Sequence, residues 1–115
     1  MIGEDALRSI LDQYDRNGWT LRRVYLSPEL QNRLESTLSA LFGDAEIKGS
    51  DIDAGWFSRG RRDGSVTWEL RWFNEFPFAL LDVINDDAEP NEVKRILRET
   101  EDRLKERIKK RAQGH

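Results

Sequence analysis

The sequence contains no cysteine and a single histidine, His115 at its last position. Without a thiol, neither a disulfide framework nor cysteine-based catalysis can be built. One histidine is too few for a multi-histidine metal site, and its place makes a conventional Ser-His triad untenable. The composition therefore excludes the commonest nucleophilic and zinc-dependent mechanisms.

Long hydrophobic runs are also missing. The longest, Phe78 to Leu81, has four residues, whereas a transmembrane helix needs about 20. Residues 1–20 lack the basic start and apolar stretch of a signal peptide. Charged residues make up 36% of the chain and hydrophobic residues 37%. We therefore predict one soluble domain, residues 1–115, in the cytoplasm and with no membrane partner.

The net charge of −3 hides an asymmetry along the chain. Residues 1–93 carry 10 Lys/Arg against 18 Asp/Glu, a charge of −8, whereas residues 94–115 carry 9 against 4, a charge of +5. Cations near the C-terminal end of a helix are stabilised by its dipole, so a solvated helix explains the basic segment. Nucleic-acid binding is the alternative interpretation.

Three helices are predicted. The first covers Glu4 to Asn17, where apolar residues recur at helical spacing. Ser27 and Pro28 are a typical N-cap and first helical residue, and this second helix is expected to end at Gly43. A long C-terminal helix is predicted from Pro90 to Arg111.

Four strands are predicted between and after the first two helices, at Trp19 to Leu26, Glu46 to Ser58, Ser65 to Phe73 and Phe76 to Ile84. The last three form an antiparallel meander. The fold class is therefore α+β, a two-layer sandwich of order α-β-α-β-β-β-α. In it, helices cover chiefly one face of a four-stranded sheet.

Alternation in the meander assigns its two faces. Trp68, Leu70 and Trp72 share the core face of the third strand. A two-residue turn at Asn74-Glu75 would pair Leu70 with Ala79 and send an apolar set to the second face. That set consists of Phe73, Phe76, Phe78, Leu80 and Ile84. Because so many apolar residues are costly to leave in water, we predict a protein partner there, most simply a second copy of the chain.

The segment Gly49 to Gly55, GSDIDAG, places two carboxylates on one side of a predicted strand. Asp51 and Asp53 could share a magnesium ion, since Mg²⁺ prefers oxygen ligands. Glu69 and Asp82 fall on the same face in the predicted register and could complete the site. The four acids are the candidate metal ligands.

Two short resemblances point to the same chemistry. Ser50 to Asp53, Ser-Asp-Ile-Asp, resembles the segment of DNA polymerase-β-like nucleotidyltransferases whose paired aspartates hold catalytic magnesium. Asp53 followed by Glu69-Leu70-Arg71 resembles the Asp then Glu-x-Lys pattern of restriction-like nucleases, with arginine in place of lysine. Both resemblances imply a divalent-metal enzyme acting on phosphate esters. The competing interpretation is a cross-strand ion pair between Asp53 and Arg71.

The predicted hairpin tip, SRGRRDG, presents three arginines: Arg59, Arg61 and Arg62. A basic β-ribbon can bind phosphate, although arginines at a turn are more often solvated.

The function we predict is that of a non-enzymatic binding or assembly protein without a cofactor, acting through protein contacts as a homodimer. The alternatives are the Mg²⁺-dependent enzyme and a nucleic-acid accessory protein that uses the hairpin tip and the basic helix.

Overall fold

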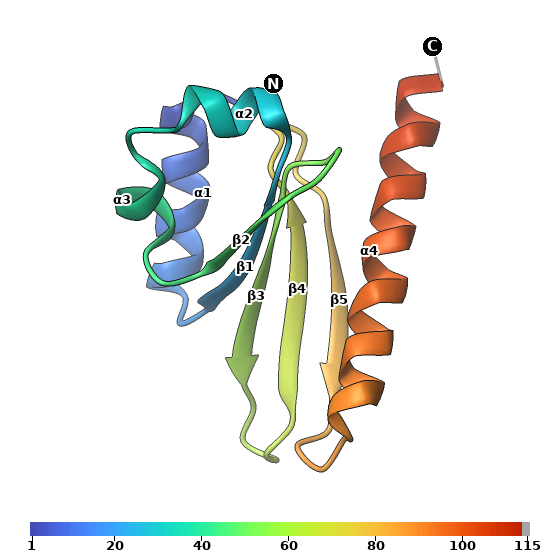
Figure 1. Cartoon of the computed structure of the whole chain (residues 1–115). Helices are drawn as coiled ribbons and strands as arrows, with labels where there is room; N and C mark the ends of the chain where they lie inside the picture. Colours follow the sequence, from blue (N-terminus) through green and yellow to red (C-terminus); the bar gives the residue numbers. More distant parts are fainter. Residues whose placement is uncertain (114–115) are drawn as a thin grey trace.

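A computed structural model describes residues 1–113 as a five-stranded sheet between two helical layers (Figure 1). The elements are α1 (Glu4–Arg16), β1 (Thr20–Leu26), α2 (Pro28–Arg33), α3 (Leu38–Phe42), β2 (Glu46–Gly49), β3 (Ala54–Gly60), β4 (Val66–Trp72), β5 (Ala79–Ile84) and α4 (Pro90–Gln113). The α+β class and the long C-terminal helix are confirmed. The two-layer, four-stranded arrangement is wrong.

The extra strand comes from the segment predicted as one strand over Glu46 to Ser58. The sheet order is β2-β1-β3-β4-β5, with β1 and β2 parallel and the other neighbours antiparallel. After β2 the chain crosses the end of β1, where the Ser50 backbone N–H donates to the Leu26 carbonyl over 2.9 Å. It then returns as β3 on the far side of β1. The two halves of the predicted strand therefore flank β1.

The second predicted helix is also divided. Ser27 caps α2 as expected, its Oγ accepting from the Leu30 backbone N–H at 3.3 Å, and Pro28 follows it. The helix ends at Arg33, because the backbone N–H and the hydroxyl of Thr37 both bind the Leu34 carbonyl in a tight turn. A second short helix, α3, follows this turn.

The alternation predicted for β4 is confirmed: Trp68, Leu70 and Trp72 all face α4 together with Trp56 of β3. The predicted pairing with β5 is wrong by one residue, because Leu70 pairs with Leu80 rather than Ala79.

The turn explains this shift. Asn74 Oδ1 accepts from the Phe76 backbone N–H at 2.9 Å, and the Trp72 N–H donates to the Phe78 carbonyl at 3.0 Å. Trp72 therefore pairs with Phe78, whereas the predicted two-residue turn would pair it with Pro77. A one-residue shift turns every side chain of β5 to the opposite face.

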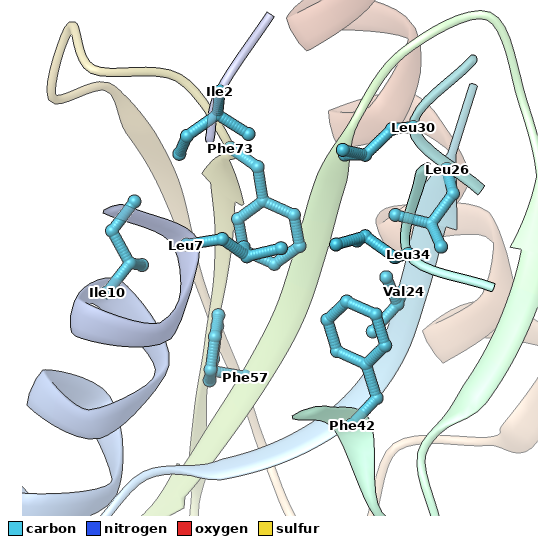
Figure 2. Packing of buried hydrophobic residues seen from close by; sticks show 10 residues of the cluster. All are labelled: Ile2, Leu7, Ile10, Val24, Leu26, Leu30, Leu34, Phe42, Phe57 and Phe73. Atoms are coloured by element: carbon cyan, nitrogen blue, oxygen red, sulfur yellow. The ribbon is translucent and has the colours of Figure 1, made fainter. Parts of the chain in front are cut away.

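A hydrophobic core fills each side of the sheet. The first lies between the sheet and α1–α3 (Figure 2) and contains Ile2, Leu7, Ile10, Val24, Leu26, Leu30, Leu34, Phe42, Phe57 and Phe73. The second lies under α4 and contains Ile52, Ala54, Trp56, Leu70, Ile84, Leu97 and Leu104. The face predicted to be open is therefore covered by α1–α3, and α4 alone covers the tryptophan face.

The predicted partner-binding set does not share a face. Phe73 is 2% exposed in the first core. Phe78, Leu80 and Ile84 pack in the core under α4. Phe76 lies in the β4–β5 turn and is 41% exposed. Within residues 1–113, these five side chains therefore do not form the uncovered apolar surface expected from the sequence.

Candidate functional site

The two aspartates of GSDIDAG have different surroundings. The Asp53 carboxylate accepts hydrogen bonds from the Ser27 backbone N–H at 2.6 Å and from the Ser27 hydroxyl at 3.3 Å. It therefore ties the start of β3 to the start of α2. Asp51 is exposed and lies 3.7 Å from the Lys105 ammonium on α4.

The other two candidate metal ligands lie on opposite faces of the sheet. Glu69 accepts a hydrogen bond from the Tyr14 hydroxyl on the α1 side. Asp82 accepts from the Thr100 hydroxyl on α4 at 2.6 Å. Within residues 1–113 the structure forms no group of three or more acidic or histidine side chains able to hold a metal ion. The four predicted ligands are thus not brought together.

Within residues 1–113, Asp53 and Arg71 do not form the ion pair predicted from the sequence. Gly55, not Asp53, is the residue opposite Arg71. The Arg71 guanidinium instead donates to the Trp72 carbonyl at 2.8 Å. Asp53 lies two pairs further along, where its carbonyl accepts from the Phe73 N–H at 2.8 Å.

The three arginines of the hairpin tip are not equivalent. Arg59 stacks over the Trp19 ring at 4.4 Å and donates to the Asn17 carbonyl at 3.1 Å, which fixes it to the end of α1. Arg61 and Arg62 are exposed in the turn. This turn lies at the opposite end of the sheet from the C-terminal end of α4 (Figure 1). The two basic regions therefore do not form one continuous surface.

A carboxylate anchors α4 to the sheet. Glu101 accepts hydrogen bonds from the Tyr25 hydroxyl of β1 at 2.5 Å and from Trp56 Nε1 of β3 at 2.7 Å. Burial, followed by the bond to Glu101, raises the pKa of Tyr25 to about 12. Tyr25 therefore remains a proton donor at neutral pH. The sequence did contain a signal for this contact, because the acid Glu101 lies between Leu97 and Leu104 on the otherwise apolar stripe of the helix.

A groove of about 710 Å³ lies between the C-terminal half of α4 and the β4–β5 turn. We call it the aromatic–basic groove. Its lining residues are Trp72, Phe76, Phe78, Arg103, Glu106, Arg107, Lys110 and Arg111. Arg111 stacks over the Phe76 ring at 3.8 Å, and Arg107 lies 5.0 Å from the centre of the Phe78 ring. Four cations, three rings and one carboxylate thus share one open groove.

A second groove, of about 560 Å³, separates α4 from β1 and β2. It is lined by cations too, but carboxylates neutralise several of them. Glu46 lies 2.6 Å from the Arg23 guanidinium and 3.8 Å from the Lys48 ammonium. Glu101 also lines this groove. The second groove is therefore the less favourable of the two for an anion.

The edge strand β5 carries two exposed apolar side chains. Leu81 and Val83 are 58% and 57% exposed. They lie on the face opposite α4, because Leu80 and Ile84 point toward the helix. Alternation along β5 did predict that Leu81 and Val83 share a face, but the wrong register placed that face in the core.

Within residues 1–113, none of the helices combines the length and the apolar character needed to cross a membrane. The chain matches no protein-family model, no curated protein and no solved structure.

Proposed function

We propose that this protein is a non-enzymatic assembly protein that forms a homodimer through the free edge of β5. The observation that supports this proposal is the pair of exposed side chains, Leu81 and Val83, on a strand with one vacant side. The cytoplasmic location and the absence of catalysis remain predictions from the sequence.

The hydrogen-bonding groups of β5 favour a strand as the partner. In an antiparallel ladder, alternate residues direct their backbone groups to the neighbouring strand. The bond from the Trp72 N–H to the Phe78 carbonyl shows which residues of β5 direct their backbone groups toward β4. Counting by twos from Phe78, these are Leu80, Asp82 and Ile84. Ala79, Leu81 and Val83 then direct their N–H and C=O groups outward. These are also the residues whose side chains leave the α4 face.

A second copy of the chain fits this edge. With a two-fold axis at Leu81, antiparallel pairing places Leu81 opposite the partner's Leu81, and Ala79 opposite the partner's Val83. The exposed side of the strand carries no charge between Ala79 and Val83, so the two copies do not repel there. The one acid of β5, Asp82, points to α4, bonds to Thr100 and lies 3.8 Å from the Arg103 guanidinium.

The same edge carries only one of the features that block pairing in many monomers, an inward charge. Natural edge strands are protected by lysine, proline, a bulge or a charge turned inward. β5 has neither lysine nor proline, and its ladder with β4 is regular. Its inward charge, Asp82, is already satisfied by Thr100. Six residues span about 20 Å, a small contact by the standards of stable dimers, so a dissociation constant in the micromolar range is expected.

The test is the molar mass in solution, measured by sedimentation equilibrium from about 5 to 200 μM. The wild-type chain should move from monomer to dimer across this range. The double variant Leu81→Lys/Val83→Lys should stay monomeric, because the charge added at position 81 would face its own copy across the axis and the charge added at position 83 would be buried against the partner's Ala79. The control Gln31→Lys/Ser39→Lys adds the same charge at exposed positions of α2 and α3 and should dimerise normally.

A second variant separates strand pairing from simple apolar contact. Leu81→Pro removes an N–H that faces outward, so it deletes an intermolecular hydrogen bond without breaking the ladder to β4. We expect a folded monomer, shown by an unchanged far-ultraviolet circular dichroism spectrum. A wild-type chain that remains monomeric at 200 μM, or a Leu81→Pro variant that still dimerises, contradicts the proposal.

A further inference from the structure

We propose that the aromatic–basic groove binds single-stranded nucleic acid, with bases stacked on its rings and phosphates held by the arginines of α4. This binding site is separate from the β5 edge and does not depend on dimer formation. It uses the basic C-terminal helix that the sequence suggested for nucleic-acid binding, but not the hairpin tip.

The rings offer stacking surface. Phe76 remains 41% exposed although the Arg111 guanidinium covers one side of its ring. Trp72 lies beside it in an edge-to-face arrangement, with ring centres 6.4 Å apart. An aromatic side chain that is exposed in this way can stack on any base, since every base has a flat π surface.

The arginines are positioned without using up their hydrogen-bond donors. Arg107 and Arg111 are placed over phenylalanine rings, and within residues 1–113 neither forms an ion pair with a carboxylate. A guanidinium stacked on a ring keeps its in-plane N–H groups available for phosphate oxygens. Among residues 1–113, Glu106 is the one carboxylate that lines the groove, against four cations, of which Arg103 also lies 3.8 Å from the Asp82 carboxylate.

The size and charge of the surroundings favour a short single strand. Arg103 to Arg111 spans about 12 Å along the helix, which suits about two nucleotides. A duplex would keep its bases stacked on one another and away from the rings. The acidic remainder of the chain, −8 over residues 1–93, repels phosphate and confines the strand to α4.

An acidic peptide could bind the cations but would leave the rings without a matching partner. A nucleotide carries both a flat ring and an anion, which is the combination present in the groove. The chemistry of the groove therefore points to nucleic acid rather than to an acidic protein segment.

The experiment is fluorescence anisotropy with a labelled 12-nucleotide oligothymidine at 50 mM salt. Micromolar affinity is expected, weakening about tenfold at 200 mM salt because two to three phosphate contacts displace counterions. Phe76→Ala should weaken binding about fivefold or more through lost stacking. Arg107→Gln/Arg111→Gln should weaken it at least as much. Arg61→Gln/Arg62→Gln, an equal charge change at the far end of the sheet, should leave it unchanged.

Several outcomes overturn the proposal. One is the absence of binding at 50 mM salt, and another is an equal loss in the Arg61→Gln/Arg62→Gln control. A third is equal affinity for a duplex, for thymidine monophosphate or for polyglutamate. Phe76→Leu, which keeps an apolar side chain but loses the ring, should behave like Phe76→Ala. If Phe76→Leu binds like wild type, base stacking is not the interaction. The Leu81→Lys/Val83→Lys variant should bind normally, which keeps this test independent of the dimer.

Discussion

The Glu101 carboxylate on α4 and the Trp56 indole on β3 are joined by a hydrogen bond of 2.7 Å across the interface between helix and sheet. The same carboxylate accepts from the Tyr25 hydroxyl. Replacing Glu101 leaves two partly buried donors without an acceptor, and hydrogen bonds to a charged group contribute about 1.5–3 kcal/mol each. We expect Glu101→Ala to lower the free energy of unfolding by about 2–4 kcal/mol in urea titrations.

The matched control for this variant is Glu99→Ala on the same helix. Glu99 is exposed and pairs with Arg95 at 3.1 Å, as side chains four residues apart on a helix commonly do. Such surface pairs contribute about 0–1 kcal/mol. Equal losses in the two variants would show that Glu101 does not anchor α4.

Both tyrosines of the chain should resist ionisation in the folded state. Burial raises the pKa of Tyr25 to about 12, and burial with the bond to Glu69 raises the pKa of Tyr14 above its usual value. We expect the absorbance at 295 nm to show no tyrosinate step near pH 10, the usual value. A step of two tyrosines at pH 10 in the folded protein would contradict the placement of both hydroxyls.

The raised pKa of Tyr25 also predicts how stability changes in alkali. A folded-state pKa above the unfolded one means that the folded chain holds its proton longer. The contribution to stability is full below about pH 10 and is lost as the pH rises from 10 through 12. The decline over this interval should be shallower in Tyr25→Phe than in wild type, as measured by denaturant unfolding at each pH.

The Phe73 ring requires glycine at position 55. A Cβ atom on Gly55 would lie 2.5 Å from the end of this ring, whereas a Cβ on Gly60 of the same strand meets nothing within 4 Å. Gly55→Ala should therefore lower stability by about 1–3 kcal/mol through overpacking. Gly60→Ala should be neutral or slightly stabilising, because alanine restricts the unfolded chain. Replacing the ring by a shorter side chain, in Phe73→Leu, should recover part of the stability lost in Gly55→Ala. Calorimetric unfolding of the single and double variants measures this recovery.

The aspartates of GSDIDAG should differ in their effects on stability. Asp53→Ala removes the acceptor for the Ser27 N–H and should cost about 1–3 kcal/mol. Asp51→Ala, at an exposed position, should change stability by less than about 0.5 kcal/mol. Titration of Mg²⁺ by calorimetry, followed by unfolding with and without the ion, tests the enzymatic alternative. Saturable binding that both variants abolish would restore the metal hypothesis.

The sequence predicted the local structure well where a single physical signal dominated. The Ser27-Pro28 start was confirmed because a cap and a proline act within one turn of chain. The two faces of β4 were confirmed because Trp68, Leu70 and Trp72 alternate with polar neighbours.

The sequence could not predict features that depend on distant parts of the chain. In β5 the alternating set Ala79, Leu81 and Val83 is wholly apolar, whereas the set Leu80, Asp82 and Ile84 contains an acid, so hydrophobic alternation favoured Leu81 over Leu80 as the buried residue. The turn chemistry at Asn74 decided the register. Likewise, Ser50 to Asp53 reads as extended chain, and the break between β2 and β3 arises because the chain must pass over the end of β1. Together, the register of β5 and the break between β2 and β3 keep the four candidate metal ligands apart.

The two cores differ in how they draw on the chain. Every buried residue of the core under α4 lies between Ile52 and Leu104, so the C-terminal half supplies this interior, and the half-buried Tyr25 of β1 packs against it. The core beneath α1–α3, by contrast, includes Phe57 and Phe73 from the C-terminal half in addition to N-terminal residues. We expect a sequential assembly in which the antiparallel ribbon and α4 form first and then serve as the template for the N-terminal segment. Pulse-labelling hydrogen exchange during refolding should show amides of β4 protected before those of β1, and the reverse order would refute this hierarchy.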